Sequence, residues 1–117
     1  MKKVVTINGK EYSMKSSAYT QFKYKNDTGR NLLADIQNIA DLAEKDNQME
    51  AMEDMTLTLL KIAYTMIEEA DSSQVTSYED FLKSADGLFD DVTWVSEVVE
   101  LAASPISRNL QNTKQEK

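Results

Sequence analysis

The chain has neither cysteine nor histidine among its 117 residues. The lack of cysteine excludes disulfide bonds and thiolate nucleophiles, and the two absences together remove the commonest zinc ligands. Without histidine the chain also lacks the commonest general base. We therefore predict no catalytic residue, no metal site and no cofactor, and we expect that the protein is not an enzyme.

Glycine and proline are scarce as well, with three isolated glycines and a single proline. A phosphate cradle needs several glycines close together, so none is expected. No apolar run approaches the roughly 18 residues of a membrane-spanning helix. The first residues carry two lysines but no apolar segment, so we expect no signal peptide and a soluble protein that stays where it is made.

Acidic residues outnumber basic ones by 20 to 13, which gives a net charge of −7. Such a charge repels a phosphate backbone, so we expect no direct nucleic-acid binding. A well-solvated surface is the simplest interpretation of the charge. A sharper alternative remains open, namely a small acidic regulator or DNA mimic that blocks a nucleic-acid-binding protein.

Several clusters of charged residues are candidate sites of chemistry. Paired carboxylates can hold a divalent ion, but these clusters lie at predicted helix ends, where a solvated face is the better interpretation. A basic and aromatic segment near residue 24 resembles a nucleic-acid-binding patch. One short helix of this kind in a chain with a net charge of −7 is weak evidence for such binding. The carboxylate clusters are Glu50, Glu53 and Asp54; Glu68, Glu69 and Asp71; and Asp86, Asp90 and Asp91. The segment contains Lys23, Lys25, Arg30, Tyr19, Phe22 and Tyr24.

Residues 4–15 predict a β-hairpin. Val4, Thr6, Tyr12 and Met14 favour strands, and the Asn8-Gly9 pair accepts the positive φ angles of a two-residue turn. An isolated hairpin is marginal in water. We therefore expect the hairpin to pack on helices of its own chain or to pair its edge with another chain.

The rest of the chain has helical periodicity. A first helix, capped by Ser16 or Ser17, carries Ala18, Tyr19 and Phe22 on one apolar face and stops at Gly29. Asn31 caps a second helix, whose polar side includes Asp35. The apolar stripe of this helix consists of Leu32, Leu33, Ile36, Ile39, Ala40 and Ala43.

Residues 49–70 predict the central helix, because two apolar stripes lie side by side on it. One stripe runs from Met52 to Ala70 and the other includes Leu57. Residues 76–79 have the form of a capping box for a short helix. A last, valine-rich helix should close at Pro105.

The predicted fold class is therefore mainly α (α+β), with an N-terminal hairpin packed on a bundle of about five helices. Residues 1–104 form a single domain, and residues 105–117 form a flexible, disordered C-terminal tail.

Methionines recur every third residue at the start of the central helix, and such flexible apolar side chains adapt to partner surfaces. Together with the edge of the hairpin they define the predicted protein-binding residues, which are Met49, Met52, Met55, Val4, Thr6 and Tyr12. We expect homo-oligomers. The alternative is a monomer whose hairpin folds back on its helices and whose methionines lie in the core.

Four segments occur in a recognisable order. They are the hairpin segment 6–12 (TINGKEY), the Phe22 helix ending in 28–32 (TGRNL), the long apolar helix, and 77–82 (SYEDFL) before a valine-rich helix. In this order, over residues 4–104, the chain resembles the small tail assembly chaperones of long-tailed phages and prophages of Gram-positive bacteria.

The resemblance implies a non-enzymatic protein that binds and solubilises the tape-measure protein and helps to recruit major tail protein. It implies a location in the cytoplasm of the host bacterium and absence from the mature virion. It also implies a longer second product, made by ribosomal frameshifting, with a further domain.

Overall fold

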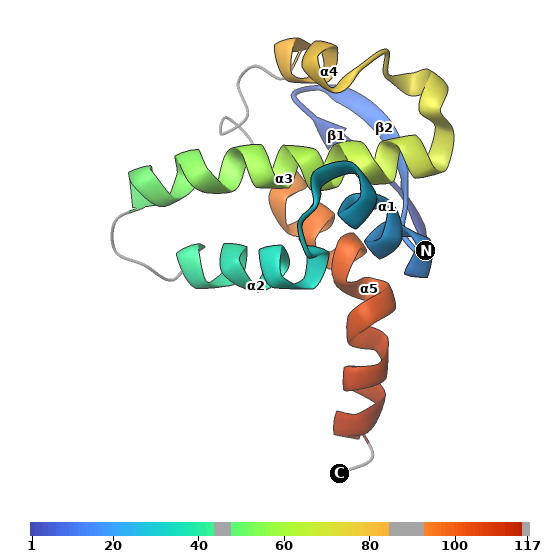
Figure 1. The fold of residues 1–117 in the computed structure, drawn as a ribbon, viewed down its shortest axis with the longest axis vertical. Helices are drawn as coiled ribbons and strands as arrows, with labels where there is room; N and C mark the ends of the chain where they lie inside the picture. Colours follow the sequence, from blue (N-terminus) through green and yellow to red (C-terminus); the bar gives the residue numbers. More distant parts are fainter. Residues whose placement is uncertain (44–47, 85–92, 116–117) are drawn as a thin grey trace.

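The structure is a computed structural model that describes residues 1–43, 48–84 and 93–115. Within these ranges the predicted class is confirmed, with an N-terminal hairpin, five α-helices and a C-terminal tail (Figure 1). In chain order the elements are β1 (Lys2–Ile7), β2 (Lys10–Lys15), α1 (Ala18–Thr28), α2 (Leu32–Ala43), α3 (Gln48–Asp71), a 3₁₀ turn η1 (Ser72–Gln74), α4 (Tyr78–Ser84) and α5 (Thr93–Gln115).

The hairpin turns at the two residues that the sequence predicts. Asn8 and Gly9 have φ angles of 53° and 79°, as a two-residue turn of this kind requires. The strands pair antiparallel with Val5 opposite Tyr12. Since side chains alternate along a strand, one face of the hairpin is apolar and buried. That face consists of Val5, Ile7, Tyr12 and Met14.

The hairpin lies on helices of its own chain, which is the first of the two arrangements expected. α3 contacts β2 and α5 contacts β1. The Tyr12 ring meets Phe81 of α4 edge to face, with 5.6 Å between ring centroids. The apolar face of a two-stranded sheet is thus covered, which supplies the support that a hairpin needs in water.

α3 is the central helix, as predicted. It contacts α1, α2, α4, α5 and β2, and it runs across the middle of the molecule in Figure 1. Leu59, Ile62, Met66 and Ile67 are almost completely buried along it. The apolar stripes are not buried throughout, because Leu57 remains 60% exposed.

The ends of the first two helices follow the predicted capping. Ser17 is the N-cap of α1, and Gly29 ends it in the left-handed conformation with φ of 74°. The side-chain oxygen of Asn31 accepts the Ala34 N–H at 2.9 Å and so caps α2. The predicted capping box at residues 76–79 is wrong by one residue, because Ser77 accepts the Asp80 N–H.

α5 differs from its prediction at its C-terminal end. Pro105 does not close it, because the helix continues to Gln115. A proline costs a helix one backbone hydrogen bond, and α5 continues in spite of this loss. The C-terminal part of α5 extends away from the other elements, so the tail leaves the domain as helix (Figure 1). Trp94, near the beginning of α5, is only 1% exposed.

Part of the prediction falls outside the described residues. This holds for the connector at residues 44–47 and for the segment 85–92, which includes Asp86, Gly87, Asp90 and Asp91. None of the described helices combines the length and apolar character needed to cross a membrane.

One side chain occupies the middle of the outer edge of β2. The carboxamide oxygen of Gln74 accepts the Ser13 N–H at 2.7 Å, and its nitrogen donates to the Ser13 carbonyl at 2.9 Å. Gln74 therefore bonds to β2 as a neighbouring strand residue would. The backbone of Ser13 is satisfied without a third strand.

We expect Gln74→Ala to lower the free energy of unfolding by about 1–3 kcal/mol, because its two hydrogen bonds to the Ser13 backbone are lost. Amide hydrogen exchange at Ser13 should accelerate at the same time. Gln21→Ala is the matched control, since Gln21 is exposed on α1. Unchanged exchange at Ser13 in the Gln74 variant would contradict this role.

Candidate protein-binding site

The two faces of α1 are the reverse of the prediction. Tyr19 and Phe22, expected on the packed face, are 55% and 64% exposed. Thr20 and Tyr24, in contrast, are each 1% exposed. The inner face of α1 is therefore held mainly by polar contacts, and its aromatic side faces solvent.

Glu69 of α3 anchors the first turn of α1. Its two carboxylate oxygens accept hydrogen bonds from the Ser17 hydroxyl at 2.7 Å and the Thr20 hydroxyl at 2.5 Å. Thr20 Oγ1 in turn accepts the Ser17 N–H at 2.8 Å. The residues that cap α1 thus also attach it to the central helix.

Lys23 anchors the next turn of α1. Its ammonium group lies 2.9 Å from Asp27 and 3.2 Å from Glu68 of α3. Burial lowers the pKa of Lys23, but hydrogen bonds to Asp27 and Glu68 raise it by more, so the net direction is upward. Glu68 and Glu69 are thus bonding partners of α1, and their interpretation as a solvated acidic face was wrong.

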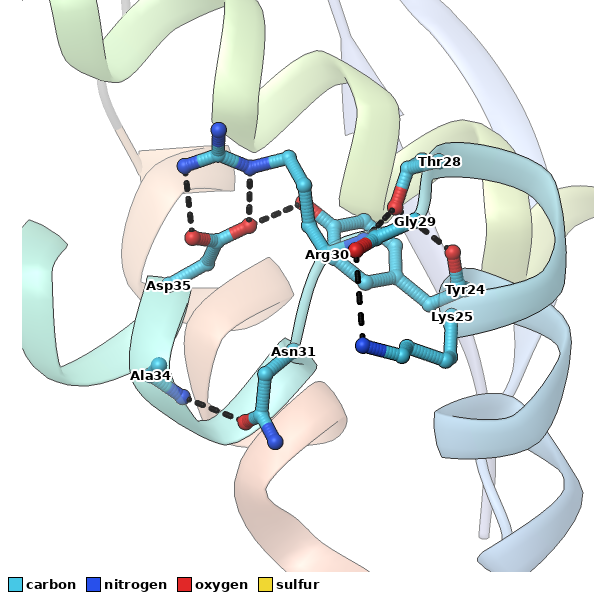
Figure 2. Close-up of polar contacts among 8 residues, drawn as sticks. All are labelled: Tyr24, Lys25, Thr28, Gly29, Arg30, Asn31, Ala34 and Asp35. Atoms are coloured by element: carbon cyan, nitrogen blue, oxygen red, sulfur yellow. Dashed lines mark hydrogen bonds and ion pairs between the residues drawn. The ribbon is translucent and has the colours of Figure 1, made fainter.

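Asp35 of α2 anchors the end of α1 and is shown in Figure 2. Its carboxylate accepts the Tyr24 hydroxyl at 2.6 Å and two N–H groups of Arg30 at 2.8 Å each. We expected Asp35 on the polar side of α2, yet it is only 5% exposed. The spacing of polar residues along α2 predicted that Asp35 faces solvent. Instead it is buried, and Arg30 and Tyr24 supply the hydrogen-bond partners that a buried carboxylate requires.

The pKa shifts in this cluster hold its groups in their ordinary charge states. The Arg30 guanidinium lowers the pKa of Asp35, against the opposing effect of burial, and Tyr24 lowers it further. Burial, followed by the Asp35 carboxylate, raises the pKa of Tyr24. Both shifts favour the charge states that the groups already have at neutral pH. The cluster therefore fixes structure.

We call these contacts the polar clamp of α1. Its members are Ser17, Thr20, Lys23, Tyr24, Arg30, Asp35, Glu68 and Glu69. Hydrogen bonds to charged groups contribute about 1.5–3 kcal/mol each, and several act together here. If α1 were turned so that Tyr19 and Phe22 were buried instead, each ring would contribute about 1.5–3 kcal/mol to stability. Breaking the clamp would also leave buried polar groups unpaired, so the clamp decides the orientation of α1.

The orientation leaves an aromatic pair on the surface, which we call the aromatic patch. The rings of Tyr19 and Phe22 lie 5.9 Å apart between centroids, tilted by 37°. A cavity of about 280 Å³ lies at the beginning of α1. Its lining residues are Met1, Ser16, Ser17, Ala18, Ser104 and Pro105. Exposed aromatic side chains are typical of surfaces that bind proteins.

The residues predicted to bind proteins do not form one surface. Val4, 55% exposed, and Thr6 lie on the outer face of the hairpin. Tyr12 is 3% exposed on the opposite face, so its assignment as a binding residue was wrong. It pairs with Val5, and strand alternation places both against the helices.

The structure describes the side chain of one methionine of this strip, Met55. Met55 is partly buried against the core, which agrees with the core alternative at this position. The side chains of Met49 and Met52 lie outside the part of the structure that is described.

The basic and aromatic segment considered for nucleic acid is divided between two roles. Lys23, Tyr24 and Arg30 belong to the polar clamp, and each is bonded to a carboxylate. Tyr19 and Phe22 remain on the surface. The other three side chains are not free to bind a phosphate backbone beside them, because their hydrogen bonds go to carboxylates of the same chain. Within the described ranges, no three acidic side chains converge as metal ligands would.

Comparisons of this chain with protein-family models, with curated proteins and with solved structures found no match. Its function is therefore inferred from its own surface.

Asp35 predicts a specific dependence of stability on pH. Its pKa is lowered in the folded state, so its contribution to stability is present above the unfolded pKa of about 3.9 and disappears as pH falls through the folded pKa. We expect Asp35→Asn to destabilise the protein by about 1–3 kcal/mol at neutral pH. The difference from wild type should shrink under acid.

Urea unfolding between neutral pH and strong acid measures both effects. Asp41→Asn is the matched control, because Asp41 is an exposed carboxylate on the same helix. A constant difference between the wild type and the Asp35 variant down to the lowest pH would contradict the assignment.

Proposed function

We propose that this chain is a phage tail assembly chaperone that binds and solubilises the tape-measure protein and helps to recruit major tail protein. The observation that carries the proposal is the aromatic patch. Tyr19 and Phe22 are turned outward by the polar clamp. A small domain that leaves two aromatic rings in water on a firmly held helix has a surface suited to a partner.

The chemistry of the patch fits an apolar stripe on a helical partner. Aromatic side chains lose little conformational entropy on binding and contribute large contact areas. A tape-measure protein, as the family resemblance implies, is a long helical chain prone to aggregate. Its amphipathic helices would offer repeated apolar stripes of the kind that helix-in-groove recognition uses.

The net charge of −7 supports the same function. A chaperone that covers apolar segments must keep the complex soluble, and a strongly acidic surface favours solubility. The order of elements adds support, because hairpin, α1, central α3, short α4 and α5 follow one another as in the resemblance. With this function the protein acts in the host cytoplasm and is absent from the mature virion.

A direct test expresses the chain together with a tape-measure protein, the partner that the family resemblance implies. The expected result is that this partner becomes soluble and co-purifies with the chain. Tyr19→Ser combined with Phe22→Ser should weaken the complex by at least about tenfold, since anchor residues of an interface contribute about 2 kcal/mol or more.

The matched control is Lys25→Ser, which changes an exposed residue of the same helix. Thermal unfolding should show that the double variant is as stable as wild type. A partner that binds the double variant as tightly as wild type would refute the role of the patch. Salt titration separates the acidic-regulator alternative, whose complex should weaken steeply with salt, whereas apolar contacts should persist.

A further inference from the structure

The two outer edges of the hairpin differ. Met1 and Ser16 exchange hydrogen bonds at 2.7 and 2.8 Å, so they are a hydrogen-bonded pair of the antiparallel ladder. This pair shows which of the following residue pairs are hydrogen-bonded and which are not. Bonded and non-bonded pairs alternate in such a ladder. The Val4 and Ser13 pair is therefore non-bonded, and the N–H and C=O groups of both residues point away from the partner strand.

On β2 this outward edge is blocked at its middle, because Gln74 bonds both backbone groups of Ser13. On β1 the outward groups belong to Lys2, Val4 and Thr6, all of which are exposed. Within the described ranges no other strand pairs with β1 on this side. An exposed edge of this kind is a template for a further strand.

We propose that β1 is an interface between two copies of this chain, which pair antiparallel with Val4 of each copy at the centre. The two hairpins then form one four-stranded sheet in the order β2, β1, β1, β2. This inference does not depend on the proposed function, since it concerns a different element from the aromatic patch.

The sequence of β1 is what selects a second copy as the occupant. Pairing centred on Val4 places Lys2 opposite Thr6 and Lys3 opposite Val5, so no lysine faces another lysine. It also engages all three outward-facing residues of each strand. The β-branched residues Val4, Val5 and Thr6 favour such pairing.

Other registers are worse. A shift toward the N-terminus places Lys3 opposite Lys3, or Lys2 opposite Lys2, and like charges directly opposite are destabilising. A shift toward the C-terminus leaves Lys2 without a partner. The charge pattern of β1 and the number of residues it can pair together favour the register centred on Val4.

Single cysteines test this register, because the chain has no cysteine of its own. In the proposed pairing the two Val4 Cα atoms lie about 5.5 Å apart, within the range that a disulfide spans. The two Thr6 Cα atoms are offset by four residues, or about 14 Å, which is too far. Val4→Cys should therefore form a covalent dimer under mild oxidation of the folded protein, and Thr6→Cys should not.

Two results would overturn the proposal. One is the absence of a covalent dimer of Val4→Cys at high protein concentration. The other is equal crosslinking of Thr6→Cys, which would indicate random collision. Both variants should give no dimer in denaturant, because the pairing depends on the folded strand.

Proline variants provide a second test by sedimentation. Val4→Pro removes an outward N–H, which the hairpin itself does not use, so the strand should still form. Glu11→Pro is the matched control, because the Glu11 N–H also points outward but lies on β2. We expect concentration-dependent dimers for wild type and Glu11→Pro, and monomers for Val4→Pro. A folded Val4→Pro variant that dimerises like wild type would contradict the interface.

Discussion

The carboxylate of Glu69 determines which side of α1 faces the interior of the domain. It accepts both the Ser17 and the Thr20 hydroxyl groups and so joins the first turn of α1 to the central helix. Lys23 and Tyr24 continue the attachment through Glu68 and Asp35. Once these groups are buried they must keep their partners, because unpaired buried polar groups are costly. The exposure of Tyr19 and Phe22 follows from that constraint.

The same physical rule acts at the hairpin. Gln74 satisfies the backbone of Ser13 on the outer edge of β2, where α3 also packs. The edge of β1 receives no such cover from the described residues. In α1 and in the hairpin, polar groups on one side have hydrogen-bond partners within the chain. The opposite side of each is left exposed and available to another protein molecule. The proposed chaperone surface and the proposed dimer interface therefore lie on different elements.

Sequence patterns predicted the elements well and the packing of α1 poorly. The turn at Asn8 and Gly9, the caps at Ser17, Gly29 and Asn31, and the central α3 depend on local chemistry, which the sequence displays directly. The face of α1 depends on Glu68, Glu69 and Asp35, which come from other helices. Apolar spacing alone favoured burial of Tyr19 and Phe22.

A usable signal was nevertheless present in the sequence. Ser17, Thr20, Lys23 and Tyr24 recur at helical spacing, so they share a face that is fit for carboxylate partners. The same reasoning applies to Tyr12, whose burial follows from its position opposite Val5 in the ladder. The continuation of α5 through Pro105 had no local signal, since proline normally ends a helix.

The orientation of α1 can be measured directly by photochemically induced nuclear polarisation, which marks tyrosine and tryptophan rings that a dissolved dye can reach. We predict a strong signal from Tyr19 and none from Tyr24 or Trp94, in line with exposed fractions of 55%, 1% and 1%. Binding of the helical partner should remove the Tyr19 signal. A silent Tyr19 together with a polarised Tyr24 in the free protein would contradict the account.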